Sequence, residues 1–377
     1  MTLCIAHGGD LSEPSGGTDR VTALAAGLDE RGLDVILMVP EPASEFPPRL
    51  DAVDVRPVAV DRYGVGNALV TAGTVAKRAL DVASTEEARL QFEHSTLAGV
   101  ATLLGASGYV LDVHDLAFAR FDHVDSPAAP VIKRGVSWLE RRAFGRADRI
   151  VTVSERMRLT LDERWGIPAG AVSVVPNGYF PERIAPVRDV DPVAGRVSFL
   201  GTLHPKIDID ALVALAESPA VTELVVIGDG HRRDRLERLA ADLPALEVTG
   251  RLPDEAAFRY VASSEAVVNP QIPSPLQRAS SPVKLYYYAA LGKPIVAAPG
   301  PDVVATLVDA DAALIADSSA AVRECVERIL RDEDLAARLA ANARDLSANF
   351  MWRHRVDALA DLNAGSDTDF APGRNDE

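Results

Sequence analysis

The 377-residue sequence has little cysteine, few aromatic residues and no long apolar run. Its two cysteines, Cys4 and Cys325, lie too far apart in the chain to form a CxxC pair or a zinc site. No apolar run reaches the roughly 18–20 uncharged residues of a membrane-spanning helix, and the first residues lack the basic start of a secretory signal. These absences predict a protein of the reducing cytoplasm.

The charge balance is strongly acidic. The formal net charge is −16, with 39 lysines and arginines against 55 aspartates and glutamates. A field of this sign repels phosphate backbones, so we expect no nucleic-acid partner. Only 5 of the basic residues are lysines, and aspartate outnumbers glutamate by 34 to 21. This composition resembles that of proteins from halophilic organisms, in which concentrated salt screens the repulsion. The few lysines therefore become informative.

Short β-branched runs alternate with helical patterns along the chain. The runs predict strands at residues 3–7, 34–39, 88–93, 108–113 and 149–154, and then at 196–201, 223–228, 245–250, 265–270 and 294–298. Strands with helices between them indicate an α/β protein with doubly wound parallel sheets.

A break in this alternation divides the chain. Residues 179–195 are rich in proline and charge and predict a linker between an N-terminal domain, 1–178, and a C-terminal domain, 196–346. The polar residues 365–377 predict a disordered tail. Because ligands bind beyond the carboxyl ends of parallel strands, we expect a site in a cleft that the two sheets face.

Two glycines, Gly16 and Gly17, precede a predicted helix whose expected N-cap is Thr18. Glycines there let backbone N–H groups approach an anion, which the helix N-terminus also favours. The alternative is an ordinary strand-to-helix loop. The spacing is not GxGxxG, so the dinucleotide fingerprint is absent.

Three of the five lysines fall in two segments of the second half. Lys206 follows the strand at 196–201, and Lys284 comes shortly after Pro282, which suits the first turn of a helix. Such lysines are suited to hold a diphosphate as point charges. For Lys293 we favour the alternative that it covers a helix C-terminus.

Other chemical signals are weaker. His114 ends a strand between Asp112 and Asp115, where it could accept a proton or be structural. Residues 208–210 read DID, a form found in metal-dependent transferases, but such repeats arise by chance in so acidic a chain. We therefore expect no metal site. The Walker, HExxH and GxSxG motifs are absent.

Several segments together resemble one family. The segment SPVKLYYYAALGKPIVAA (281–298) resembles the S-P-x-K-x-x-E-Y-x-A-x-G-K-P-V pattern of the family 4 glycosyltransferases of the GT-B fold. Other segments resemble that family in the expected order, namely SGGTDRV (15–21), VLDVHDL (110–116), ADRIVTVSERMR (147–158), VVPNGY (174–179), FLGTL (199–203) and NFMWRHRVDALADL (349–362). The resemblance covers nearly the whole chain. It implies two Rossmann-like domains facing across a cleft, with a helix in 347–364 that returns to the first domain.

The resemblance also implies roles. The donor would be a nucleotide diphosphate-sugar, transferred with retention and without an obligatory metal or other cofactor. The residues implied in donor binding are Lys206, Lys284, Gly16, Gly17, Gly201, Thr202, Gly228, Asp229, Arg251, Ser281, Pro282 and Tyr287. His114 and Asp112 would assist the chemistry, and a glycan or lipid-linked acceptor would enter past His94 and Asp115.

The chain departs from the family pattern at three places. Tyr287 stands where the family has a glutamate that contacts the ribose hydroxyls, and a tyrosine cannot bind a diol through two oxygens. An earlier family glutamate is not evident in residues 269–282, and Thr202 lies where an arginine is often found. These departures leave open a non-catalytic relative that binds a glycan or a partner transferase. An inverting GT-B transferase or a nucleotide-sugar epimerase also stays open.

A basic segment lies between residues 131 and 149. It holds Lys133, Arg134, Arg141, Arg142, Arg146 and Arg149 against only Glu140 and Asp148. As a helix it would bury a stripe of Ile132, Val136, Leu139 and Ala143 and turn many basic residues outward. Such a face could contact an anionic membrane, or it could be a solvated face paired with nearby acids.

Overall fold

The computed structural model describes residues 1–13, 15–42, 44–60, 68–119 and 126–364. For residues 363 and 364 it describes the backbone alone. The described chain forms two compact units. The N-terminal unit comprises Met1–Asn177 and the helix that begins at Trp352, and the C-terminal unit comprises Gly178–Met351. The tail at 365–377 lies outside the described residues.

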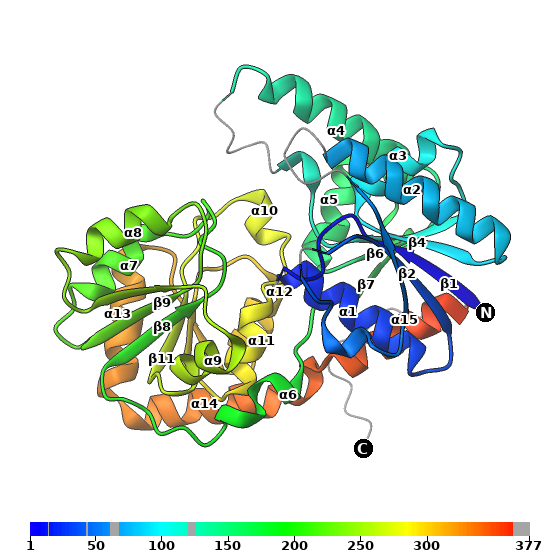
Figure 1. Cartoon of the computed structure of the whole chain (residues 1–377). Helices are drawn as coiled ribbons and strands as arrows, with labels where there is room; N and C mark the ends of the chain where they lie inside the picture. Colours follow the sequence, from blue (N-terminus) through cyan, green and yellow to red (C-terminus); the bar gives the residue numbers. More distant parts are fainter. Residues whose placement is uncertain (14, 43, 61–67, 120–125, 365–377) are drawn as a thin grey trace. The chain divides into compact units, whose positions relative to one another are not determined.

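The N-terminal unit alternates strands and helices (Figure 1). Its strands are β1 (Thr2–Ala6), β2 (Asp34–Pro40), β3 (Asp54–Val58), β4 (Arg89–Glu93), β5 (Tyr109–Val113), β6 (Ala147–Thr152) and β7 (Val172–Val174). Its helices are α1 (Gly16–Asp29), α2 (Ala68–Thr85), α3 (Ser95–Leu103), α4 (Ala129–Phe144), α5 (Glu155–Trp165) and α15 (Trp352–Ala364), with short 3-10 turns at Pro48–Leu50 and Ala169–Ala171.

All seven strands of this unit are parallel, in the order β3-β2-β1-β4-β5-β6-β7. Helices cover both faces of the sheet. On one face Leu3 and Ile5 of β1 pack in a core with α1 and α15, whereas Cys4 faces α2 and its thiol lies 3.9 Å from the Ala79 carbonyl oxygen. The alternation along β1 therefore buries both sides of the strand, as a doubly wound sheet requires.

The C-terminal unit repeats this plan with six strands. They are β8 (Arg196–Leu200), β9 (Glu223–Ile227), β10 (Leu246–Gly250), β11 (Ala266–Asn269), β12 (Ile295–Ala297) and β13 (Ala313–Ile315). The helices are α6 (Pro181–Ile184), α7 (Ile209–Ala216), α8 (Arg233–Ala240), α9 (Asp254–Ala262), α10 (Pro275–Arg278), α11 (Val283–Ala290), α12 (Asp302–Asp309), α13 (Ser319–Arg331) and α14 (Glu333–Ser347), with 3-10 turns at Ala185–Val187 and Ala348–Phe350.

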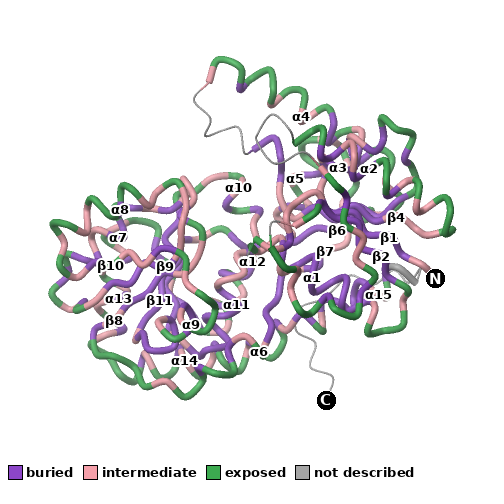
Figure 2. The backbone as a smooth tube through the Cα atoms, in the orientation of Figure 1, coloured by how far each residue is buried: buried purple, intermediate pink, exposed green. Residues whose placement is uncertain are grey.

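The second sheet is also wholly parallel, in the order β10-β9-β8-β11-β12-β13. One face packs on α7 and α13 and the other on α9, α11 and α14. Figure 2 shows the strands of each unit as largely buried tubes beneath exposed helix surfaces. The predicted α/β class with two doubly wound parallel sheets is confirmed.

Residues 179–195, which the sequence predicted to be a linker, belong to the C-terminal unit. This stretch contains α6, and Tyr179, Ile184 and Val187 are buried in the core of that unit. At the other end of the chain, α15 packs on α1 in the N-terminal unit, where Val356 fills the space beside Gly27. The packing of α15 on α1 therefore joins the end of the described chain to the N-terminal unit.

Candidate functional site

Glycines occupy the carboxyl edge of the second sheet, where three strands end. Gly201 follows β8, Gly228 follows β9 and Gly250 ends β10, with φ values of 133°, 144° and 71°. A Cβ atom on Gly228 would lie 2.1 Å from the carbonyl oxygen of Gly201. Only glycine fits this backbone geometry and close approach. Lys284, the Gly201 carbonyl oxygen and the Arg233 guanidinium lie where side chains of Gly201, Gly228 and Gly250 would be, so the strand ends pack closely at this edge.

Lys284 lies at the same edge. It is the second residue of α11, near the helix start as predicted, whereas Pro282 is the N-cap and not a residue of the first turn. Its Nζ is 3.9 Å from the centroid of the Phe199 ring, and a Cβ on Gly201 would lie 2.7 Å from it. The fold therefore places this ammonium group directly at the end of β8.

The loop after β8 brings Lys206 near. Its backbone N–H donates to His204 Nδ1 at 3.2 Å, and its carbonyl oxygen accepts from the N–H of Ile272 at 2.8 Å. Burial, together with the positive charge of Lys206, lowers the pKa of Lys284 to about 7. The ammonium groups of Lys206 and Lys284 are both half-buried and repel each other. An anion bound between them would relieve that repulsion.

Asp229 and Arg251 flank the same strand ends. The Asp229 carboxylate accepts from the Gly230 N–H at 2.7 Å and from Arg233 at 2.9 Å, and these hydrogen bonds lower its pKa, with a smaller contribution from the charge of Arg251. In contrast, Asp208 of the DID segment is the N-cap of α7, accepting from the Ala211 N–H at 3.1 Å.

Other expected donor residues have partners within the unit. The Ser281 hydroxyl lies 2.7 Å from that of Tyr286. Tyr287 is buried, its ring centroid is 4.7 Å from that of Phe258, and its hydroxyl accepts from Arg183 at 3.0 Å. Tyr287 thus packs in the core of the C-terminal unit instead of presenting a group that could replace the family carboxylate. Thr202 is exposed in the loop after β8.

Two further residues of α11 and the turn after it have structural roles. The Tyr288 hydroxyl, which sequence reasoning missed, accepts from the Leu200 N–H at 2.7 Å and so ties α11 to the end of β8. Lys293 donates to the carbonyl oxygen of Ser264 at 3.1 Å, just beyond the C-terminus of α9. This is the helix-covering role favoured for that lysine.

In the N-terminal unit the expected N-cap of α1 is wrong. Ser15, not Thr18, caps the helix, because its side chain accepts from the Thr18 N–H at 3.0 Å. Gly16 and Gly17 are therefore the first two helical residues, where N–H groups lack partners inside the helix. A Cβ on Gly17 would lie 3.4 Å from His114 Nε2.

A buried ion pair between Arg20 and Asp112 lies beside His114. The Arg20 guanidinium contacts both oxygens of Asp112, with Nε at 3.1 and 2.9 Å and Nη2 at 2.8 Å. The same guanidinium donates to the Val175 carbonyl oxygen at 2.9 Å and to the Asn177 side chain at 3.2 Å. His114 Nδ1 lies 4.0 Å from Asp112, which is too long for a hydrogen bond, and the orienting role expected for Asp112 stays a prediction. Burial raises the pKa of Asp112, and the Arg20 charge opposes this.

Glu93 and His94 complete this strand-end cluster. Burial and the charge of Asp112 raise the pKa of Glu93 to about 8, which favours its protonated form near neutral pH. The rings of His94 and His114 lie 5.6 Å apart, and Asp115 follows half-buried. Ligand-type atoms of Glu93, Asp112 and His114 lie within 4.8 Å of one another. Arg20 already pairs with the Asp112 carboxylate in this cluster, so a cation there would compete with the guanidinium.

Sequence reasoning missed Arg20 and Glu93. The signals were present, because Arg20 occupies a core-facing position of α1 and Glu93 ends a predicted strand. A charge at either position implies a buried partner.

Two family models match the chain. That of a glycosyl transferase 4-like domain matches residues 15–178, and that of glycosyl transferases group 1 matches residues 194–332. Among curated proteins, the chain is similar to the putative teichuronic acid biosynthesis glycosyltransferase TuaH of Bacillus subtilis (strain 168), with 26% identity over 197 residues, 50% of this chain and 49% of TuaH. The chain thus spans about half the length of the curated relative it matches.

Solved structures resemble the whole chain. Sucrose-phosphate synthase from Thermosynechococcus elongatus has a TM-score of 0.77 at 18% identity, covering 96% of this chain and 98% of that one. HepE of Anabaena, in complex with UDP-glucose, has a TM-score of 0.72 at 16% identity, covering 97% and 99%. These likenesses and the two parallel sheets define a GT-B fold.

The chain belongs to the glycosyltransferases of GT-B type, with a glycosyl transferase 4-like domain followed by a group 1 domain. The predicted fold and the resemblance to family 4-like glycosyltransferases are therefore confirmed. No helix in the described part of the chain is both long enough and apolar enough to cross a bilayer. The cytoplasmic location and the halophilic origin stay predictions.

Proposed function

We propose that the protein transfers a hexosyl-type sugar from a nucleotide diphosphate-sugar to a glycan or lipid-linked acceptor, with retention and without an obligatory metal. The observation that carries this proposal is the pair of lysines at the carboxyl edge of the second sheet. Lys284 lies against Gly201, and the charge of Lys206 acts on it. The solved complex of HepE with UDP-glucose supports a donor of this class.

In this proposal Lys206 and Lys284 hold the diphosphate of the donor. Breaking the bond between sugar and phosphate leaves negative charge on the diphosphate, and fixed positive groups stabilise that charge most in the transition state. Gly201 and Gly228 let the ligand approach the backbone. Asp229 and Arg251 would lie by the nucleoside, with Thr202, Ser281 and Pro282 at the border of the site.

The N-terminal unit supplies the acceptor side of the proposal. His114, oriented by Asp112, would accept a hydrogen bond or a proton from the acceptor hydroxyl, and His94 would contact the acceptor beside it. Gly16 and Gly17 offer helix N-terminal N–H groups to an anion.

The test is thermal denaturation with UDP, GDP and their sugars. A ligand that binds only the folded state at about a hundred times its Kd stabilises it by about 2.7 kcal/mol. We expect one nucleotide to raise the Tm, and Lys284→Met to abolish that rise. Lys77→Met, on the exposed side of α2, is the matched control and should leave it unchanged. A Tm that no nucleotide moves would contradict the proposal.

Transfer itself needs a second measurement. Release of nucleoside diphosphate on addition of an acceptor, with the anomeric configuration of the product read by NMR, tests the reaction and its retention. Full activity in the presence of EDTA is expected. The buried Tyr287 favours one second candidate, a non-catalytic relative that binds a glycan. Glycan binding without any nucleotide effect would support it.

A further inference from the structure

Helix α4 of the N-terminal unit exposes apolar side chains that its pattern predicted to be buried. Leu139 and Ala143 are buried as expected, but Ile132 is 47% exposed, and Val136 is only partly buried. On the outer side Val131 is 73% and Trp138 50% exposed. Since Val131 and Trp138 lie seven residues apart, they share one face of the helix.

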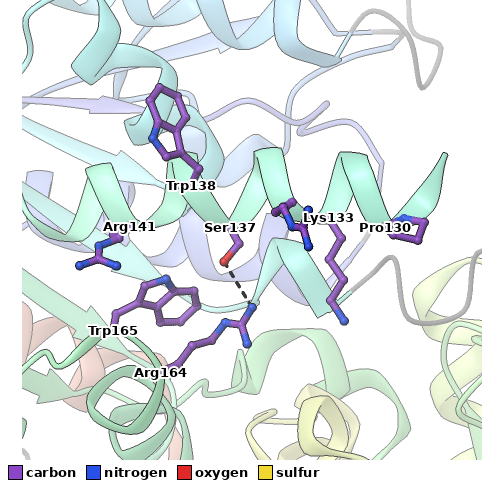
Figure 3. A pocket seen from close by; sticks show the side chains of 8 residues that line it. Pro130, Lys133, Ser137, Trp138, Arg141, Arg164 and Trp165 are labelled. Carbon is purple, nitrogen blue, oxygen red and sulfur yellow. Dashed lines mark hydrogen bonds between the residues drawn. The ribbon is translucent and has the colours of Figure 1, made fainter.

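Basic residues surround this apolar face. Figure 3 shows a groove between α4 and the end of α5, with Lys133, Arg141 and Arg164 around it. The groove has a volume of about 530 Å³. Its lining consists of Pro130, Lys133, Arg134, Ser137, Trp138, Arg141, Arg164 and Trp165, which include four cationic and two indole side chains and no acid.

Aromatic rings hold some of these cations in place. The Arg164 guanidinium lies 3.7 Å from the centroid of Phe118 and 5.2 Å from that of Trp165, and it donates to the Ser137 hydroxyl at 3.3 Å. The Arg142 guanidinium lies 5.2 Å from the centroid of Trp138. These contacts place cations against aromatic rings on two sides of α4, Arg142 beside Trp138 and Arg164 beside Phe118 and Trp165.

The charge of this surface is opposite to that of the chain. With a net charge of −16, acids for pairing are plentiful, yet among the described residues no carboxylate forms an ion pair with Arg134 or Arg141. Exposed tryptophan and aliphatic side chains beside clustered Lys and Arg are the composition that binds at the interface of an anionic bilayer.

We propose that the outer face of α4, with the groove beside it, docks on an anionic phospholipid surface. Val131 and Trp138 enter the headgroup layer, and Lys133, Arg134, Arg141 and Arg164 bind the lipid phosphates. The proposal goes beyond the proposed transfer reaction and does not require it. If the acceptor is lipid-linked, this docking holds the enzyme at the surface that carries it.

The test is co-sedimentation of the full chain with vesicles of phosphatidylcholine, with and without phosphatidylglycerol. We expect binding only to the vesicles with phosphatidylglycerol, weakened by added salt. Since each basic residue near such a surface contributes on the order of a fivefold change, Arg134→Glu with Arg141→Glu should lower the partition coefficient at least about tenfold. Trp138→Ala should lower it several-fold without changing the charge.

The matched control is Lys77→Glu with Arg78→Glu, an exposed pair on α2 that changes the net charge equally. It should leave binding near the wild-type level. Thermal melts with the nucleotide that raises the Tm of the wild type monitor folding and donor binding in every variant, so loss of docking is distinguished from failure of the proposed function. Equal binding to neutral vesicles, or equal effects of the two double variants, would overturn the proposal. A rise in Tm with glycerol phosphate in the absence of vesicle binding would also overturn it. So would a dimer in gel filtration that the double variant Arg134→Glu with Arg141→Glu dissociates.

Discussion

The substitution Lys284→Met should stabilise the unliganded protein near neutral pH. In the folded protein, burial and the charge of Lys206 lower the pKa of Lys284 from 10.5 to about 7. Each pKa unit corresponds to about 1.4 kcal/mol, so the full shift sets an upper bound of about 5 kcal/mol on the cost of the charge. The side chain is partly exposed, and solvent screening reduces the expected gain to about 2 kcal/mol. Methionine keeps the length of the chain and removes the charge.

The sign of the pH dependence follows from the same shift. Between pH 7 and 10.5 the unfolded state binds the Lys284 proton and the folded state does not, so the free energy of unfolding rises with pH. From pH 6 to pH 9 the wild type should therefore gain about 1–2 kcal/mol relative to Lys284→Met. Urea denaturation of both proteins at the two pH values, at constant ionic strength, gives this difference.

The result that would refute this reasoning is a Lys284→Met variant that is less stable than the wild type at pH 6. The same holds for a variant whose stability follows that of the wild type at both pH values. Either result would mean that the Lys284 ammonium is solvated or paired in the folded state, and the anion site would lose its main support.

Three further perturbations test other parts of the structure. Arg20→Met should cost about 3–5 kcal/mol in urea denaturation, because it leaves a buried carboxylate unpaired. In contrast Arg31→Met, just after the end of α1 and in a more exposed pair with Asp357, should cost less than about 1 kcal/mol. Because the pKa of Glu93 is raised from 4.5 to about 8 in the folded state, the stability due to this group falls as pH rises from 4.5 to 8. Glu93→Gln should flatten that fall in thermal melts across this range. An unchanged slope of Tm against pH would contradict the protonated state. Gly228→Ala should lower the Tm markedly, because the new Cβ would meet backbone at 2.1 Å, whereas Gly32→Ala, also at positive φ but with nothing within 4 Å, should cost only about 1 kcal/mol in its melt.

The predicted and observed strands differ mainly at sheet edges. Buried central strands such as β1 and β9 are mostly apolar runs, and these were predicted from their composition. The strands that were missed, β3, β7 and β13, each lie at the edge of a sheet. An edge strand has one paired side, so short and partly polar sequences such as DVRPV (54–58) are sufficient there, and they resemble loops.

The sequence alone determined the two-sheet α/β class, the position of Lys284 at a helix start and the family resemblance, because these depend on local periodicity and on the order of short motifs. Tertiary structure alone decided which distant groups meet. It paired Arg20 with Asp112, placed Lys284 against Gly201, buried Tyr287 among aromatic rings and left Ile132 exposed. Each of these outcomes depends on which neighbour covers a residue, and that is set by packing between segments far apart in the chain.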